Sequence, residues 1–327
     1  MLFVVYGHIN FFSFKITPFV GKITEAIQMP LFFFISGFVA YKATRDNEIK
    51  LVLGKIWNKF RVLIIPATIM GLLYSTLILN KTIPEFVFEK MKYGYWFPFS
   101  LFSMILIYKL CELFTRGKSE NFFKGFVALV AILLWLLKYA IISSHIFQVL
   151  NETLSLWQTL THFPFFVFGA LLSSKRAVYE RELCNNGLVN TFLLVAFCFC
   201  LFALDVELPN VNLPIGGVLK IFIGISGTLL VLNFIIKYIS YIENSKIGKF
   251  LDLVGRKSLI VYLLHYFLLP DLTSFSNVIN VSSPVINISL GIVFSIIIVV
   301  ISIVIGNIIG LSPFFSKYML GVKSKKL

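Results

Sequence analysis

The sequence predicts an all-α membrane protein with about ten transmembrane helices, the first of them truncated. Apolar residues make up 58% of the 327 residues and charged residues only 13%, whereas ordinary globular domains average about 45–50% and about 25%. The apolar surplus falls in blocks long enough for a helix to cross about 30 Å of hydrocarbon. A soluble helical core could not cover the outer faces of so many blocks, which excludes a soluble fold.

The blocks are rich in Phe, Leu, Ile and Val and are bounded by charges, Pro, Gly or Asn. They cover residues 1–14, 28–44, 61–80, 94–114, 124–143, 156–174, 188–204, 213–237, 257–276 and 284–312. The first is too short to span, so we expect it to be the outer part of a helix whose inner end precedes this sequence. No repeat or soluble insertion interrupts the pattern, and we expect residues 1–327 to form one membrane domain.

The basic residues alternate between loops in a way that sets the orientation. If the chain starts on the cytoplasmic side, 22 of the 29 Lys and Arg residues lie in inner segments. The seven left outside are Lys15, Lys22, Lys81, Lys90, Lys92, Lys138 and Lys220. Cytoplasmic loops carry an excess of basic residues. We therefore expect a multi-pass protein of the inner (cytoplasmic) cell membrane with both termini in the cytoplasm.

The charge and the cysteines exclude two further classes of function. A net charge of +14 would indicate nucleic acid in a soluble protein, but here the loop bias accounts for it and no nucleic-acid partner is expected. Metal-ligand or CxxC spacing is absent among the four cysteines, Cys111, Cys184, Cys198 and Cys200. No metal site and no bound cofactor are expected.

Polar groups at membrane depth are costly and are therefore candidates for function. His8 lies in the outer half of the first helix, where it could serve catalysis or merely bind a neighbouring helix. Ser258, Tyr262 and His265 are spaced to share one helix face. Such a stripe could line a cavity or join helices through hydrogen bonds.

Two more motifs each allow a structural and a functional interpretation. Ser36-Gly37 favours close approach of two helix backbones and lacks the GxSxG frame of a hydrolase nucleophile. The basic residues Lys55, Lys59 and Arg61 precede Pro66 on the inner side. They are a topology signal, an anionic-lipid contact, or a site for a cytoplasmic anion such as the phosphates of coenzyme A.

Taken together, six motifs in order resemble the acyltransferase 3 family of integral membrane O-acyltransferases, and within it the fucose 4-O-acetylase-like branch. The motifs are Gly7-His8, MPLFFFISGF (29–38), Arg61 with Pro66, YWFP (95–98), PFFVFG (164–169) and SLIVYLLH (258–265). In two places the sequence departs from the family. The basic residue that the family carries earlier in helix one would lie ahead of Met1, and Gln28 stands where relatives often have histidine.

The resemblance implies an acyl-CoA donor, commonly acetyl-CoA, used from the cytoplasmic side. It also implies a hydroxyl acceptor on a cell-surface polysaccharide or lipid-linked sugar precursor. On this reading His8 is the catalytic base, and Lys59 and Arg61 bind the donor. The candidate cavity-lining residues are Ser36, Trp96, Ser258, Tyr262 and His265.

Two other classes of protein have similar helix counts. A transporter or flippase of lipid-linked saccharides is the main alternative, although such proteins often show inverted repeats and we find no internal symmetry. A polysaccharide polymerase would have a large outer loop, and no outer segment here exceeds roughly 20 residues. The acceptor sugar, the hydroxyl modified and the oligomeric state do not follow from the sequence.

Overall fold

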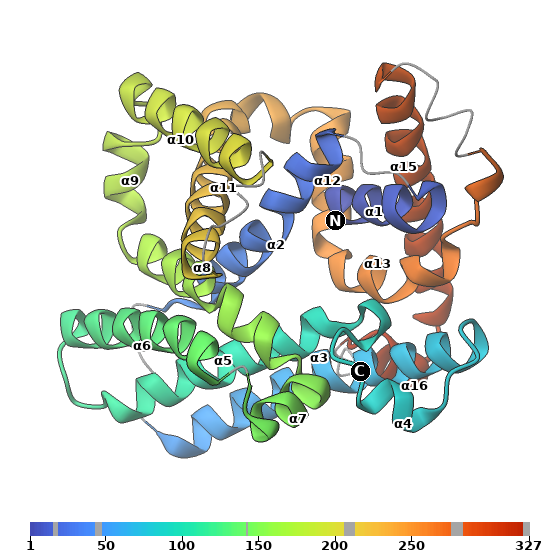
Figure 1. The fold of residues 1–327 in the computed structure, drawn as a ribbon, viewed down its shortest axis with the longest axis horizontal. Helices are drawn as coiled ribbons and strands as arrows, with labels where there is room; N and C mark the ends of the chain where they lie inside the picture. The colour runs from blue at the N-terminus through green and yellow to red at the C-terminus, as the bar shows by residue number, and fades with distance from the viewer. Residues whose placement is uncertain (16–18, 43–47, 142, 206–212, 276–283, 323–327) are drawn as a thin grey trace. The chain divides into compact units, whose positions relative to one another are not determined.

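The computed structural model describes residues 1–15, 19–42, 48–141, 143–205, 213–275 and 284–322. Every regular element in these ranges is a helix (Figure 1). In the first half of the chain these are α1 (Leu2–His8), η1 (Ile9–Phe14), α2 (Phe19–Ala40), α3 (Ile49–Leu77), α4 (Ile83–Val87), η2 (Lys92–Gly94), α5 (Trp96–Phe114), α6 (Glu120–Ile141) and α7 (His145–Leu154). The second half has α8 (Leu156–Ser174), α9 (Arg176–Glu182), α10 (Gly187–Asp205), α11 (Leu213–Glu243), α12 (Lys246–Arg256), α13 (Ser258–Leu264), η3 (His265–Leu268), η4 (Thr273–Phe275), α15 (Pro284–Ile309) and α16 (Pro313–Met319).

The all-helical class is confirmed for the described residues, whereas the count of about ten spans is not. Six described helices are long and apolar enough to cross a membrane, or seven if α9 and α10, bent by 99°, are counted as one. The first block forms α1 and η1, and the ninth forms α13 and η3, both of them shorter apolar helices. The 19-residue α8 is not among the six, and it carries Gln158, Thr159 and His162 in its first half.

The third helix begins well before residue 61, where the third apolar block of the sequence starts. Helix α3 begins at Ile49 and runs for 29 residues, because the segment holding Lys50, Lys55 and Lys59 extends the apolar helix without a Gly-Pro break. Other connecting segments also form short helices. Amphipathic α12 is one, and its start is capped by Ser245, whose hydroxyl accepts from the backbone N–H of Gly248 at 2.9 Å.

The chain divides into two compact units. The first contains Met1–Gln28, Phe60–Tyr95 and Asn244–Leu327, and the second contains Met29–Lys59 and Trp96–Glu243. In the first unit, α1 packs against α15, and α13 and η3 also contact α15 (Figure 1). Residues from the two ends of the chain therefore meet there.

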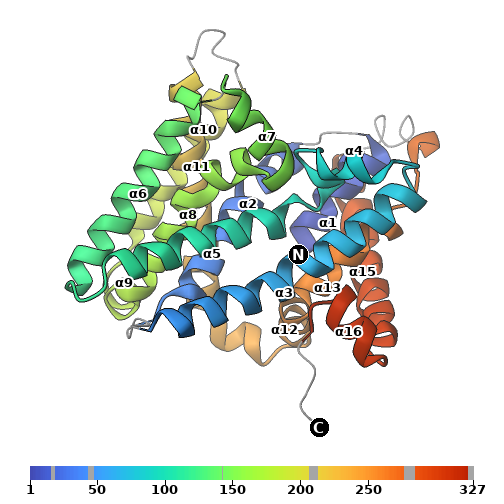
Figure 2. The same ribbon diagram turned by 90° about the horizontal axis from the view of Figure 1, so that it is seen from below.

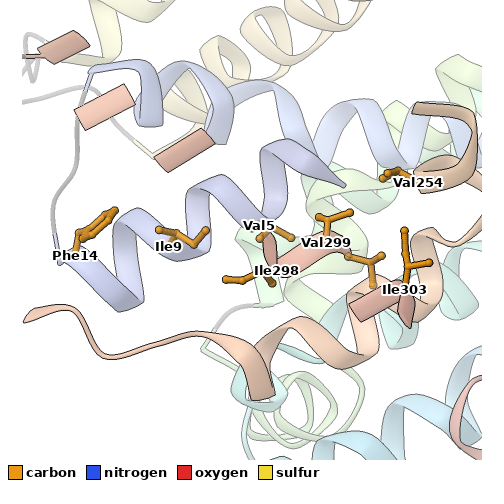
Figure 3. Packing of buried hydrophobic residues seen from close by; sticks show 8 residues of the cluster. Val5, Ile9, Phe14, Val254, Ile298, Val299 and Ile303 are labelled. Atoms are coloured by element: carbon orange, nitrogen blue, oxygen red, sulfur yellow. The ribbon is translucent and has the colours of Figure 1, made fainter. Parts of the chain in front are cut away.

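The core of the first unit joins α1 to α15. Figure 3 shows Val5 and Ile9 of the N-terminal helix with Ile298, Val299 and Ile303 of α15. All five are almost fully buried. Fully burying such a side chain contributes about 1.5–3 kcal/mol, so this cluster anchors the helix that carries His8.

The second unit is arranged around α8, which contacts α5, α6, α7, α9 and α11. Helices α10 and α11 run side by side, as both views show (Figures 1 and 2). Within this unit α2 and α8 approach backbone to backbone. A Cβ at Gly37 would overlap the carbonyl oxygen of Phe166, and a Cβ at Gly169 would overlap that of Phe34. This confirms the packing role expected of Gly37.

We predict that Gly37→Ala destabilises the protein, because the added methyl meets backbone that neither helix can move aside cheaply. Overpacking of this kind costs about 1–3 kcal/mol. The change is measured as the shift in thermal unfolding temperature of the detergent-solubilised protein.

The matched control is Gly54→Ala in α3, where a Cβ meets nothing within 4 Å. Replacing glycine by alanine inside a helix stabilises by about 0.5–1 kcal/mol. Equal unfolding temperatures for the two variants would contradict the close helix crossing.

Candidate functional site

His8 is the last residue of α1, where the helix widens. Residues Ile9–Phe14 form a π-helical turn, a rare conformation that recurs at functional sites. The apolar face of the helix is buried against α15, and His8 lies on another side. Its imidazole contacts residues from the ninth apolar block, in particular His265 and Tyr266.

The two histidines are hydrogen-bonded to each other. His8 Nδ1 lies 2.8 Å from His265 Nε2, and the two rings are nearly parallel, with centroids 5.0 Å apart. His265 itself is fully buried. Residues 257 positions apart in the chain therefore form one pair inside the first unit.

The backbone around His265 determines which nitrogens carry protons. His265 Nδ1 lies 3.0 Å from the carbonyl oxygen of Val261 and 2.8 Å from that of Tyr262. A carbonyl only accepts, so Nδ1 carries the proton and Nε2 of a neutral His265 is an acceptor. His8 must then donate from Nδ1. Its Nε2 is left with a free lone pair, as a general base requires.

A hydroxyl group faces that lone pair. Tyr266 Oη lies 3.3 Å from His8 Nε2 and 3.4 Å from the carbonyl oxygen of Gly94. Tyr262 donates to the same Gly94 carbonyl at 2.6 Å, and Tyr95 donates to the carbonyl of Leu263 at 2.8 Å. The histidine pair is thus bordered by tyrosines that belong to two separate parts of the chain.

The segment before α5 holds Gly94 in place with an unusual backbone. Lys92, Tyr93 and Gly94 have φ values of 49°, 48° and 103°. For residues other than glycine such conformations cost about 1–3 kcal/mol each. Lys92 is buried, and its ammonium group donates to the carbonyls of Phe86 and Val87. Strain concentrated beside a histidine pair indicates that the position of the Gly94 carbonyl matters.

Other buried polar groups near His8 do not belong to this cluster. Tyr6 and Asn10 have polar side-chain atoms without hydrogen-bond partners among the described residues. They sit two residues to either side of His8 and so point away from it, toward Gly291 of α15. The amide of Gln28 lies against Gly7, 3.5 Å from the position a Cβ would take there.

The structure brings together only some of the residues expected at the site. His8, His265 and Tyr262 meet, since Tyr262 shares the Gly94 carbonyl with Tyr266. Ser258 opens α13, and within the described ranges it has no hydrogen bond to this group. No sequence motif singled out Tyr266 or Gly94, although Tyr266 directly follows His265 and Gly94 separates two tyrosines.

The expected donor-binding residues lie on one helix. Lys59 and Arg61 are both in α3, where Lys59 is exposed and Arg61 half-buried. They are two residues apart, so their side chains leave the helix on roughly opposite sides. Lys55 and Lys59, four apart, share a face.

Two further candidates belong to the second unit. Ser36 donates its hydroxyl to the carbonyl of Phe32 at 2.8 Å, an intrahelical bond. The rings of Trp96 and His162 are tilted by 30° with their centroids 5.8 Å apart, and Phe33 contacts both. No group of His, Cys, Asp or Glu that could hold a metal ion occurs within the described ranges.

An all-helical, multi-pass membrane protein with a buried histidine pair is the class that the fold and the cluster define. The sequence model of the acyltransferase 3 family, described as an acyltransferase domain, matches residues 1–306. The chain therefore belongs to this family of membrane acyltransferases. No curated protein and no solved structure matches it.

We predict that Gly94→Ala disrupts the cluster. A Cβ there would overlap Cζ and Oη of Tyr266, and the φ of 103° disfavours any L side chain. The thermal unfolding temperature should fall, by the equivalent of at least about 1 kcal/mol. Gly255→Ala in α12, where a Cβ meets nothing within 4 Å, should leave it unchanged or raise it. A Gly94→Ala protein as stable as the parent would contradict the described geometry.

Proposed function

We propose that this protein transfers an acetyl group from cytoplasmic acetyl-CoA to a hydroxyl of a cell-surface polysaccharide or a lipid-linked sugar precursor. The observation that carries the proposal is the His8–His265 pair, which leaves the lone pair of His8 Nε2 unused by the pair itself and facing the Tyr266 hydroxyl at 3.3 Å. Family membership supports acyl transfer in general. The O-acetyl specificity, the CoA donor and the glycan acceptor are the finer part of the proposal, as is the fucose 4-O-acetylase-like branch.

The chemistry explains why a paired histidine suits this reaction. An alcohol is a poor nucleophile at neutral pH, so a base must accept its proton as it attacks the thioester. Histidine has a reference pKa of about 6.5 and is largely neutral at pH 7. In many enzymes a nucleophile is activated by an adjacent base, and that base is oriented in turn by a hydrogen bond to a further group. Here His265 accepts from His8 Nδ1, which holds the ring with Nε2 directed away from the pair.

The proposed transfer moves one proton through His8 and one acyl group from sulfur to oxygen. The acceptor O–H gives its proton to His8 Nε2 while its oxygen forms a bond to the acyl carbon. The carbonyl electron pair moves onto oxygen and returns as the C–S bond breaks. The coenzyme A thiolate leaves and takes the proton from His8 Nε2, so the base is regenerated and the products are an ester and a thiol.

The donor side of the proposal rests on α3. Its inner end carries Lys55, Lys59 and Arg61 in a region that the loop charges assign to the cytoplasm. Arg61 leads into the buried part of the helix, where Leu63, Pro66 and Ala67 are buried. A guanidinium group binds phosphate oxygens in a bidentate manner. Because these side chains leave α3 on roughly opposite sides, Arg61 and Lys59 are the proposed contacts for different phosphate groups of coenzyme A. Both termini of the chain are proposed to lie on the same, cytoplasmic side.

The transporter or flippase of lipid-linked saccharides remains distinguishable by experiment. A flippase needs no thioester and no base, and it moves its substrate without changing it. Binding and consumption of acetyl-CoA by the purified protein separate the two functions.

We predict that His8→Ala abolishes transfer. General-base assistance contributes about 10²–10⁴-fold, and the acetylation rate should fall by that factor. The measurement is transfer of radiolabelled acetyl from acetyl-CoA to glycans in host membranes that contain the full-length protein. A parental rate in the His8→Ala protein would overturn the assignment of His8.

Two further substitutions accompany this experiment. His145→Ala replaces an exposed histidine at the start of α7 and should retain the parental rate. His265→Ala removes the group that orients His8 without removing the base, so its rate should lie between those of the parent and His8→Ala. A parental rate in His265→Ala would show that the pair is not what activates His8.

We predict that Arg61→Gln raises the KM for acetyl-CoA, because the glutamine amide loses the charge that holds a phosphate. The loss of one charge-assisted hydrogen bond, about 1.5–3 kcal/mol, corresponds to roughly a 10- to 150-fold rise. The KM for acceptor should stay constant. Arg116→Gln, at an exposed position between α5 and α6, is the control. Equal KM values for acetyl-CoA in both variants would remove Arg61 from the donor site.

A further inference from the structure

The hydroxyl of Tyr266 is the third polar group at the histidine pair. Its side chain is buried, and its ring lies 4.2 Å from that of His265 and 4.9 Å from that of His8, measured between centroids. It stands within hydrogen-bond reach of Nε2, the one nitrogen of the pair that the other contacts leave free. Any substrate hydroxyl that approaches His8 Nε2 must therefore come next to this phenol.

The Tyr266 hydroxyl has two weak acceptors rather than one strong one. The distances to His8 Nε2 and to the Gly94 carbonyl are 3.3 Å and 3.4 Å, both well beyond the usual O–H donor distance of about 2.7–2.8 Å. The Gly94 carbonyl already accepts from Tyr262 at 2.6 Å. The proton of Tyr266 is consequently easy to redirect toward a better acceptor.

The neighbouring tyrosines differ in this respect. Tyr95 donates to the Leu263 carbonyl at 2.8 Å and Tyr262 to the Gly94 carbonyl at 2.6 Å, so both hydroxyls are committed to the backbone. Tyr74 contributes its ring, whose centroid is 5.5 Å from that of Tyr266. Among these four tyrosines, Tyr266 is the one whose hydroxyl faces His8 Nε2, the proposed base.

We propose that Tyr266 is a catalytic residue that donates its hydroxyl hydrogen bond to the acyl carbonyl oxygen as negative charge develops there. This inference rests on the proposed acyl transfer and names a further participant in it. When the acceptor hydroxyl reaches His8 Nε2, it displaces the phenol from that nitrogen. The phenol O–H then points at the site where the acyl carbon is attacked.

Proton and electron movements remain balanced with Tyr266 in this role. The phenol keeps its proton throughout and only shares it with the oxyanion. His8 Nε2 takes the acceptor proton and delivers it to the leaving thiolate. When the carbonyl re-forms, the oxygen loses its negative charge and the Tyr266 hydroxyl returns to His8 Nε2 and the Gly94 carbonyl.

The surrounding structure holds the phenol in position for this task. Tyr266 is in η3, a 3-10 turn directly after α13, which places it beside His265. The rings of Tyr74, Tyr95 and Phe12 pack around it. Gly94 has no side chain, and the phenol fills that space. A donor held in place beforehand stabilises a transition-state charge without reorganising.

The test is Tyr266→Phe in the full-length protein in its host membranes, assayed with radiolabelled acetyl-CoA. Removing one oxyanion donor costs about 10²–10³-fold in kcat, and we expect a loss of that size with an unchanged KM for acetyl-CoA. Tyr95→Phe is the matched control, since it removes a buried hydroxyl from the same cluster that does not touch His8. A kcat of Tyr266→Phe within about threefold of that of Tyr95→Phe would overturn the proposal.

A second substitution separates donation from packing. 3-Fluorotyrosine at position 266 keeps the ring and the hydroxyl but makes the phenol a stronger hydrogen-bond donor. A role in charge stabilisation predicts a kcat at or above the parental value for this protein, together with the loss in Tyr266→Phe. If both proteins lose kcat equally, the hydroxyl acts only through packing and the proposal fails.

Failure of the inference and failure of the proposed function give different results. A parental protein that consumes no acetyl-CoA overturns the proposed function itself. A parental protein that transfers acetyl, loses this activity in His8→Ala and keeps it in Tyr266→Phe overturns only the role of Tyr266.

Discussion

The arrangement of the site depends on one bifurcated hydrogen bond within a single helical turn, from His265 Nδ1 to the backbone carbonyls of Val261 and Tyr262. Because this bond places the proton on Nδ1, His265 offers only a lone pair to its neighbour, and His8 must donate to it. The reactive lone pair of electrons then lies on His8 Nε2, on the side of the ring that faces away from His265. A local contact between a side chain and its own helix thus determines the chemistry of a residue at the other end of the chain.

Packing away from the reacting atoms holds the His8–His265 pair and its neighbouring tyrosines in place. Val5 and Ile9 fix α1 against α15 through the apolar core of the first unit, so His8 cannot move away without exposing that core. The positive φ values of Lys92 and Tyr93 are compensated by buried contacts, among them the bonds of Lys92 to the carbonyls of Phe86 and Val87. The strained segment positions one carbonyl, that of Gly94, to accept from two tyrosines.

The described part of the first unit holds the proposed base and the hydroxyl that we assign to the oxyanion. The second unit is characterised instead by close helix packing and by aromatic rings around its buried histidine. There, the glycines Gly37 and Gly169 let α2 and α8 meet backbone to backbone, and His162 is enclosed by aromatic rings. Its Nδ1 bonds to the carbonyl of Gln158 in the preceding turn. Buried histidines therefore occur in both units, but only His8 and His265 form a pair that leaves one nitrogen facing a hydroxyl.

The sequence by itself determined the helical membrane class and the family, because apolar blocks and ordered motifs are local properties that need no knowledge of packing. It also singled out His8 and His265 separately, since a polar group in an apolar block is costly wherever it lies. Only the tertiary structure decided that the two histidines form one pair, and that Tyr266 and Gly94 stand beside them. Hydrogen bonds between residues more than 250 positions apart arise from how α1, α13 and α15 pack, which no spacing along the chain encodes.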